Sequence, residues 1–268
     1  MTINHKILLT GGGTGGSVAP LLAVAEELGI RNYEFLWLGT KNGLEREMVE
    51  REGIEFKAIE SGKFRRYFSW RNFIDLFLIK LGFFQSFFII LKWRPDIVLT
   101  AGSFVSAPVV WAAWLLRVPI LVHQQDARPG LANKLMAPFA RVITVTFEES
   151  LKDYGKKAVW TGNPTRGKIT PLNKGGFPPQ AERGIFKNNG EKMPVILIIG
   201  GGTGAMAINE LVWKSLDELT KFCRIIHITG KGKNNTPLRK GGEGGYISFE
   251  FLNIDQMAEA YAAADIVI

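Results

Sequence analysis

Apolar and polar residues follow one another along the chain in a pattern that predicts alternating strands and helices. An apolar strand at 7–10 is followed by a glycine-rich turn and by an Ala- and Leu-rich helix that ends at Leu28. The alternation continues, with strands expected at 33–38, 54–59, 96–99, 119–123 and 142–146 and helices at 42–52, 73–91, 107–116 and 133–139. Strands that alternate with helices are typical of a parallel sheet covered by helices, so the sequence predicts an α/β fold.

The opening unit of strand, glycine turn and helix occurs a second time. It begins again at Val195, where Gly200, Gly202 and Ala205 have the G-x-G-x-x-A spacing. Strands are expected after it at 224–229 and 247–251, followed by a helix at 255–263 and the start of another strand at Asp265. A repeated unit of this kind indicates two domains of one architecture.

A stretch of different composition separates the two units. Residues 170–194 mix proline, glycine, asparagine and lysine, and they have no apolar period, which is typical of a linker or long loop. We therefore expect two Rossmann-like domains, at 1–163 and 195–268, joined by 164–194, with parallel sheets that face one cleft. Two to three strands are too few for a doubly wound second domain, so we expect that domain to be incomplete and the chain to be truncated.

The first glycine turn is suited to holding an anion. Gly11, Gly13 and Gly16 have the G-x-G-x-x-G spacing, and residues without a Cβ let a phosphate approach the backbone amides at a helix N-terminus. The spacing alone is a weak signal, and a tight turn without any ligand remains an alternative.

The end of the second strand argues against a dinucleotide cofactor. Folds that bind nicotinamide or flavin dinucleotides place an acid there for the ribose hydroxyls, whereas this chain has Gly39 and Thr40, with Glu45 well past the strand end. No lysine follows the glycines as in a P-loop.

The positive charge is concentrated in one aromatic stretch. The formal net charge is +8, and residues 61–94 hold seven basic residues against the single acid Asp75. Phe64–Pro95 also contains eleven aromatic residues, and the apolar segment 73–91 is interrupted by Asp75 and Lys80, which would be costly in mid-membrane. We expect an amphipathic helix that rests on an anionic membrane surface and is partly buried in the fold. The alternative is a crossover helix packed in the core.

Two further features are a string of polar residues after one predicted strand and a single cysteine. His123, Gln124, Gln125 and Asp126 follow an apolar strand, at the sheet edge where open α/β sheets bind ligands. A lone histidine there is as often structural as functional. Cys223 is the only cysteine, which points to a reducing compartment.

Several motifs in this order give the chain its resemblance to a known family. They are GGTGG with a following proline (Gly12–Pro20), GSFVSAP (Gly102–Pro108), HQQD (His123–Asp126), GNPTR (Gly162–Arg166), GGGTGA (Gly200–Ala205), TGKG (Thr229–Gly232) and MAEAYAAAD (Met257–Asp265). Together they resemble the peptidoglycan N-acetylglucosaminyltransferases of glycosyltransferase family 28, which have a GT-B fold.

The resemblance implies an inverting, metal-independent hexosyltransferase without cofactors. Its donor would be UDP-GlcNAc and its acceptor the C4 hydroxyl of undecaprenyl-pyrophosphoryl-MurNAc-pentapeptide. It would act in peptidoglycan synthesis, and so in cell-wall biogenesis, cell shape and division, as a peripheral protein on the cytoplasmic face of the cell membrane. Nucleic acid is not expected as a partner.

The resemblance also implies site residues, carried over by motif. Donor contacts fall on Thr14, Gly15, Gly16, Asp126, Arg166, Gly202 and Ile254. The acceptor pyrophosphate would lie in the turns that hold Gly13, Ser17, Gly102, Ser103 and Ser106. The membrane patch would comprise Arg65, Arg66, Trp70, Phe73, Phe77 and Lys80. The sequence ends before the segment that in this family holds the uracil, ribose and diphosphate.

Three departures from the family pattern bear on the general base. Ser17 stands where the family usually has histidine, Gln124 and Asp126 replace the Glu and Asn of its HEQN motif, and Gly202 replaces a serine. Serine has no suitable pKa for a base, so the candidates are His123 and Asp126. The alternatives to this transferase are a transferase for another lipid such as diacylglycerol, a non-catalytic nucleotide-sugar-binding protein, and a dinucleotide-dependent oxidoreductase.

Overall fold

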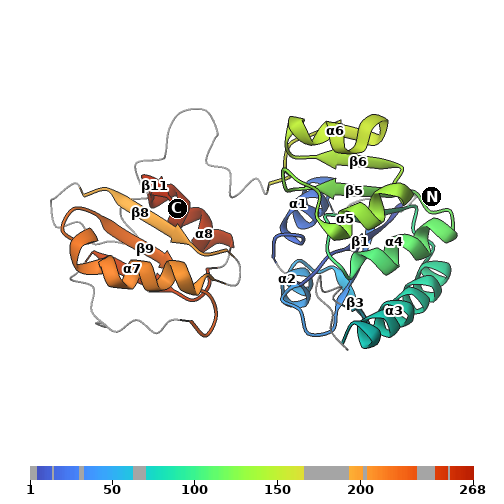
Figure 1. Cartoon of the computed structure of the whole chain (residues 1–268), viewed down its shortest axis with the longest axis horizontal. Coiled ribbons are helices and arrows are strands. Elements are labelled where there is room, and N and C mark those ends of the chain that lie inside the picture. Colours follow the sequence, from blue (N-terminus) through green and yellow to red (C-terminus); the bar gives the residue numbers. More distant parts are fainter. Residues whose placement is uncertain are drawn as a thin grey trace. The chain divides into compact units, whose positions relative to one another are not determined.

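The computed structural model divides the chain into two compact units, Met1–Arg166 and Gly167–Ile268 (Figure 1). The structure describes residues 5–13, 15–29, 33–62, 71–165, 193–201, 204–233, 245–252 and 254–268. The predicted linker falls almost wholly outside these ranges, so its extent stays a prediction.

A seven-stranded parallel sheet forms the centre of the first unit. Its strands are β1 (His5–Thr10), β2 (Tyr33–Thr40), β3 (Glu55–Ile59), β4 (Ile97–Thr100), β5 (Ile120–Gln124), β6 (Val142–Val145) and β7 (Ala158–Trp160). The order across the sheet is β3-β2-β1-β4-β5-β6-β7, and every neighbouring pair is parallel. The strand order reverses between β1 and β4, which is where open α/β sheets bind their ligands.

Helices cover both faces of this sheet (Figure 1). They are α1 (Ala19–Leu28), α2 (Glu45–Arg51), α3 (Arg71–Trp93), α4 (Ser106–Leu115), α5 (Leu131–Met136) and α6 (Leu151–Tyr154), with short 3₁₀ turns at Ala137–Phe139, Glu148–Ser150 and Gly155–Lys157. Ile7 and Leu9 of β1 pack with α1 and α2, whereas Leu8 packs with α3 and α4. The alternation of side chains along a buried strand thus fills two cores.

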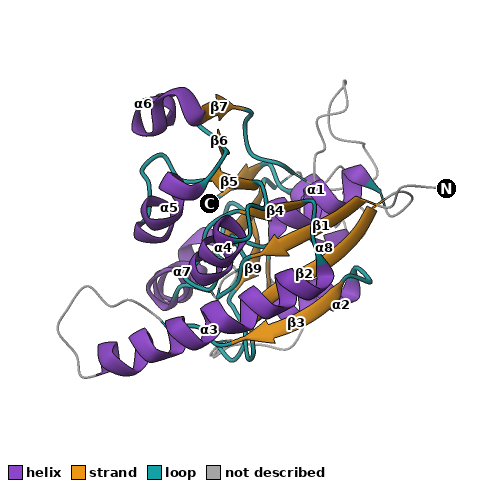
Figure 2. Ribbon diagram, turned by 90° about the vertical axis from the view of Figure 1, so that its right-hand side faces the viewer, coloured by secondary structure: helices purple, strands orange, loops and turns teal. Residues whose placement is uncertain are grey.

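Helix α3 keeps one apolar face uncovered. It packs against α4 and lies at the lower margin of the ribbon in Figure 2. By length and composition it could cross a membrane. Asp75 is buried, so it points into the protein. The large side chains left exposed on this helix are Leu76, Phe77, Leu81, Phe84, Phe88 and Leu91. The predicted long helix is therefore present, with apolar side chains on both its covered and its exposed sides and with Asp75 on the covered side. Its contact with a membrane stays a prediction.

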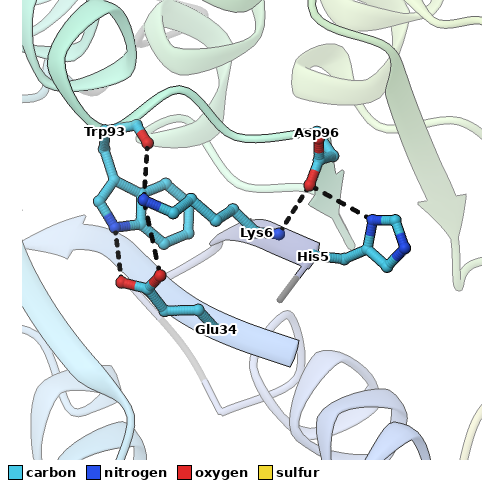
Figure 3. Close-up of polar contacts among 5 residues, drawn as sticks. All are labelled: His5, Lys6, Glu34, Trp93 and Asp96. Carbon is cyan, nitrogen blue, oxygen red and sulfur yellow. Dashed lines mark hydrogen bonds and ion pairs between the residues drawn. The ribbon is translucent and has the colours of Figure 1, made fainter. Parts of the chain in front are cut away.

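A cluster of five residues fixes the end of α3 to the sheet (Figure 3). Lys6 of β1 pairs with Glu34 of β2 at 3.5 Å, and its ammonium lies 5.4 Å from the centre of the Trp93 ring. The Trp93 indole donates to Glu34 at 3.3 Å. Asp96 accepts the Lys6 backbone N–H at 2.8 Å and lies 3.6 Å from the His5 ring. The helix is thereby anchored at the edge of the sheet where β1, β2 and β4 begin.

The second unit contains a four-stranded parallel sheet. Its strands are β8 (Val195–Ile199), β9 (Arg224–Ile228), β10 (Tyr246–Phe249) and β11 (Ile266–Val267), in the order β10-β9-β8-β11. Helix α7 (Met206–Leu219) packs on the face with Ile198 and Ile225, and α8 (Ile254–Ala263) packs on the face with Leu197 and Ile226. The expectation of two to three strands was too low, because even the two residues of β11 pair with β8.

Candidate active site

Two glycine turns of the first unit lie side by side where β1 and β4 end. The Ser106 hydroxyl donates to the Thr10 carbonyl at 3.1 Å, and the Ser103 hydroxyl donates to the Gly12 carbonyl at 2.8 Å. Ser103 has a positive φ of 118°, a strained conformation for a residue with a side chain. These contacts join the turn after β1 to the turn after β4, as parallel neighbours in the sheet require.

Ser17 braces the first turn from inside. Its hydroxyl accepts the Gly12 N–H at 3.1 Å and lies 3.2 Å from the Gly12 carbonyl, to which it donates. The side chain is buried. The hydroxyls of Ser17, Ser103 and Ser106 therefore all have partners within the protein, and none of the three is free to bind pyrophosphate without giving up a contact.

The backbone amides at two helix N-termini remain available. Among the described residues, no side chain caps the N-terminus of α1 or of α4. Within the described ranges, the amides of Gly15 and Gly16 before α1, and of Phe104 and Val105 before α4, have no hydrogen-bond partner. Unpaired amides at the positive ends of two helix dipoles favour an anion.

Glu45 closes one end of the first turn. This buried side chain from α2 accepts the Gly13 N–H at 3.1 Å, the Thr40 N–H at 2.8 Å and the Thr40 hydroxyl. Although Glu45 lies past the end of β2 in sequence, its carboxylate returns to that strand end. Gly13 therefore has no free amide, and a pyrophosphate would have to displace Glu45 to bind there.

The geometry favours a structural role for His123. The ring is buried, with Nδ1 2.9 Å from the Thr144 hydroxyl and Nε2 3.1 Å from the Asn163 side-chain oxygen. Burial lowers the pKa of His123, and the Asn163 hydrogen bond opposes this only in part. A neutral ring with both nitrogens engaged is poorly placed to take a proton from a substrate.

Gln124 shapes the loop that follows β5. The sequence predicts that Gln124 follows the strand at 119–123, but in the structure Gln124 is the last residue of β5 and is buried. Its amide donates to the carbonyls of Asp126 at 2.7 Å and Arg128 at 3.1 Å. It accepts from Asn133 at 2.6 Å and from the Tyr154 hydroxyl at 2.8 Å. A glutamate here would turn a carboxylate oxygen toward the two carbonyls, so the amide fits this loop.

Asp126 is the candidate base that remains free. Its side chain is exposed and has no partner among the described residues. The neighbouring Gln125 donates to the Gly16 carbonyl at 2.9 Å, which ties this loop to the first glycine turn. The loop that carries Asp126 thus contacts the first glycine turn, and the Asp126 side chain is exposed to solvent.

The glycine turn of the second unit is held against β9. Gly204 has a φ of +71°, and a Cβ on it would collide with the Thr229 carbonyl. Asn209 of α7 donates to the same carbonyl at 2.9 Å, and Lys233 donates to the Gly204 carbonyl at 2.7 Å. No described side chain caps α7, whose N-terminus follows this turn.

Several predicted site residues cannot be placed. Thr14, Arg65, Arg66, Trp70, Arg166 and Gly202 lie outside the described residues. Phe73 lies in α3 and Ile254 begins α8, but their side chains also lie outside what is described. In the described part of the chain, no group of three His, Cys, Asp or Glu residues is placed to hold a metal ion.

Other site residues were missed by sequence reasoning. Glu45 lies outside the motifs found in the sequence, and Asn163 belongs to the GNPTR motif, but its contact with His123 is made only in the folded chain. Asn133 is buried beside Gly102, and its side-chain oxygen has no hydrogen-bond partner among the described residues. Phe104 and Val105 lie within the second glycine turn, which the GSFVSAP motif indicated, although they were not named individually.

Comparisons with known proteins identify the family. The model of the glycosyltransferase family 28 N-terminal domain matches residues 7–145, and that of the glycosyltransferase family 28 C-terminal domain matches residues 195–268. The chain belongs to glycosyltransferase family 28. The N-terminal family domain contains the two glycine turns of the first unit, and the C-terminal family domain contains the glycine turn of the second unit.

Relatives within family 28 are close in sequence. A UDP-N-acetylglucosamine–N-acetylmuramyl-(pentapeptide) pyrophosphoryl-undecaprenol N-acetylglucosamine transferase of Clostridium botulinum is 44% identical over 98% of this chain and 72% of its own length. The enzyme of that name numbered 2 in Bacillus cereus is 41% identical over the same shares of the two chains. The family predicted from the motifs is therefore confirmed.

Solved structures agree with this assignment. The crystal structure of Acinetobacter baumannii MurG is 25% identical, with a TM-score of 0.62 over 98% of this chain and 70% of its own. A UDP-GlcNAc 2-epimerase from Neisseria meningitidis has a TM-score of 0.60 over 98% of this chain and 76% of its own at 15% identity, which shows a shared fold only. The chain has the predicted α/β class and the GT-B fold of family 28.

Proposed function

We propose that this chain transfers GlcNAc from UDP-GlcNAc to undecaprenyl-pyrophosphoryl-MurNAc-pentapeptide, as an inverting hexosyltransferase of peptidoglycan synthesis. The observation that carries the proposal is the 44% identity, over 98% of the chain, to a transferase of that name. The oxidoreductase alternative loses its basis in family 28, and Glu45 fills the strand end where a dinucleotide ribose would bind.

The acceptor pyrophosphate is proposed to lie between the N-termini of α1 and α4. The amides of Gly15, Gly16, Phe104 and Val105 would hold it, which supports the predicted turns but moves the contacts from serine hydroxyls to the backbone. Gly102 has a φ of +93°, so the second turn can bring its backbone close to the ligand.

The chemical step requires a base for the acceptor hydroxyl and stabilisation of the leaving UDP. We assign the base to Asp126, because its side chain is exposed whereas His123 is buried and engaged. The N-terminus of α7, which no described side chain caps, is suited to the diphosphate of the nucleotide sugar, and Arg166 stays a predicted donor contact. Thr14, Gly202 and Ile254 stay predicted donor contacts.

Helix α3 is proposed to hold the protein on the cytoplasmic face of an anionic membrane, where the lipid acceptor is found. Its support is the exposed apolar face, on which Phe77 and Phe88 are 67% and 64% exposed. Lys80 lies on the same helix and would meet lipid phosphates. Arg65, Arg66, Trp70 and Phe73 are the remaining predicted members of this patch.

The proposed function is tested by acceptor choice. The protein is incubated with labelled UDP-GlcNAc and either undecaprenyl-pyrophosphoryl-MurNAc-pentapeptide or diacylglycerol, and lipid-soluble label is counted. Transfer to the first acceptor alone is expected. Transfer to diacylglycerol instead would favour the related lipid transferase, and UDP-GlcNAc binding without any transfer would favour the non-catalytic alternative.

A further inference from the structure

Glu45 is a buried carboxylate placed inside a turn that is otherwise suited to anions. Its side chain is 0% exposed, so it does not touch a bound substrate in this conformation. One oxygen accepts the Gly13 N–H at 3.1 Å, and the other accepts the N–H and the hydroxyl of Thr40. No ion pair to Glu45 is found among the described residues. The carboxylate therefore takes the position at Gly13 that a ligand oxygen would otherwise occupy.

The surrounding backbone makes room for this carboxylate. A Cβ on Gly12 or on Gly43 would collide with the Glu45 carboxylate, and a Cβ on Gly39 would lie 3.1 Å from its Cγ. Three glycines from three different segments thus surround one side chain. A side chain at Gly12 or Gly43 would push the Glu45 carboxylate out of its present position, whereas at Gly39 the Phe56 ring lies closer than Glu45 does. The absence of a Cβ at Gly12 and Gly43 thus leaves room for the Glu45 carboxylate.

The negative charge of Glu45 opposes the binding of an anion at one end of the first glycine turn. A carboxylate hydrogen-bonded to Gly13 repels a second anion from that end of the turn, and burial strengthens the repulsion. The opposite end, at Gly15 and Gly16, keeps its amides without a partner among the described residues, as do Phe104 and Val105 in the adjoining turn. One end of the glycine turn is therefore closed to phosphate and the other is open.

We propose that Glu45 is a positioning residue that sets where the acceptor pyrophosphate lies in the first glycine turn. By excluding the anion from Gly13, it directs the pyrophosphate to the N-termini of α1 and α4. The acceptor hydroxyl is then brought to Asp126, on the loop that Gln125 ties to Gly16. This inference rests on the proposed function, and it concerns the register of the bound anion, not the chemistry.

Glu45→Gln is the test variant because it keeps the shape and removes the charge. Whichever way the amide is turned, its NH₂ group faces a backbone N–H, of Gly13 or of Thr40. The matched control is Glu47→Gln on the same helix, where the carboxylate is exposed and pairs with Arg51. Thr40→Val, which removes one donor to Glu45, is the milder second variant.

Two readouts separate positioning from a merely structural role. In protein labelled with ¹⁵N-glycine, inorganic pyrophosphate should shift the amides of Gly15 and Gly16 in the unaltered protein, and also that of Gly13 in Glu45→Gln. Transfer to the lipid acceptor should fall by roughly tenfold or more in Glu45→Gln, the size expected when a charge-assisted hydrogen bond is lost, although pyrophosphate binds at least as tightly. Glu47→Gln should change neither.

Loss of both pyrophosphate binding and transfer in Glu45→Gln would show a structural role, and no change in either would show an inert residue; each overturns the proposal. If Glu45→Gln does not fold, Thr40→Val decides by the same two readouts. If the unaltered protein shows no transfer but Gly13 responds to pyrophosphate only in the variant, the proposed function fails and the exclusion of anions by Glu45 stands.

Discussion

At the scale of single residues, hydrogen-bond partners separate site residues that look alike in sequence. His123 and Asp126 belong to one polar string, but one is buried between Thr144 and Asn163 and the other is exposed. Neither burial nor partners can be found in the string itself, because they depend on β6 and on the chain after β7. Sequence reasoning could therefore find the string but could not choose within it.

The first prediction follows from this contrast. Asp126→Ala should lower kcat for GlcNAc transfer by about 10²-fold or more, the usual contribution of a general base, with little change in stability. His123→Asn should instead lower the midpoint of thermal unfolding, because a smaller side chain leaves Thr144 or Asn163 without its partner. Steady-state kinetics and thermal melts of both variants check this. A normal kcat in Asp126→Ala would remove Asp126 from the mechanism.

A second residue-scale prediction concerns His227 in the second unit. The ring is buried between Tyr246 and Asn209, and burial lowers its pKa from 6.5 to about 4. In the unfolded chain His227 therefore binds a proton below about pH 6.5, whereas in the folded chain it binds one only below about pH 4. The stabilisation from a neutral His227 is fully present above pH 6.5. It is lost as the pH falls, by at most about 1.4 kcal/mol per pH unit.

Denaturant unfolding of the protein between pH 7 and pH 4.5 measures this slope. His227→Gln keeps a neutral polar group at all these values and should show a shallower loss of stability. If the free energy of unfolding changes equally with pH in the variant and in the unaltered protein, the pKa of His227 is not lowered by folding.

At the scale of elements, the local pattern predicted most of the fold. The strand–turn–helix units at β1 and β8 and the long helix α3 were expected from apolar periodicity and glycine spacing, because both signals lie within a few residues. Contacts that form when the chain folds back onto an earlier strand were not predicted. Glu45 reaches back to Thr40 from α2, and β11 pairs with β8 through only two residues. Such contacts are tertiary, so no local pattern reports them.

The third prediction compares two glycines that both have positive φ. Gly204→Ala should destabilise the second unit by more than the roughly 1 kcal/mol due to φ alone, because its Cβ would collide with the Thr229 carbonyl. Gly232→Ala is the control, since its φ is +70° but nothing lies within 4 Å of its added Cβ. Unfolding midpoints of both variants give the comparison. Equal losses would show that the turn can move away from β9.

At the scale of the whole molecule, the features proposed for anion binding and for membrane binding lie on different elements of the first unit. The amides between α1 and α4 suit an anion, and the outer face of α3 suits a lipid surface. The formal charge of +8 adds a general attraction to anionic membranes. A lipid-linked pyrophosphate, the acceptor proposed above, would use both features.

The fourth prediction tests this division. Replacing Phe77, Phe84 and Phe88 together by serine should greatly reduce co-sedimentation with vesicles that contain phosphatidylglycerol, because it removes three of the exposed apolar side chains. Phe222→Ser is the control, as Phe222 is 57% exposed but lies in the second unit. Binding of the unaltered protein should also weaken as salt rises from about 0.05 M to 0.5 M. Retained binding in the triple variant would remove α3 as the membrane surface.

The most direct measurement is the structure of the product formed from UDP-GlcNAc and undecaprenyl-pyrophosphoryl-MurNAc-pentapeptide. Mass spectrometry and NMR of the isolated lipid identify the sugar added, the hydroxyl that carries it and its anomeric configuration. The account predicts one GlcNAc on the C4 hydroxyl of MurNAc, with the configuration opposite to that of the donor. An unmodified acceptor, a sugar on another hydroxyl or a retained configuration would contradict it.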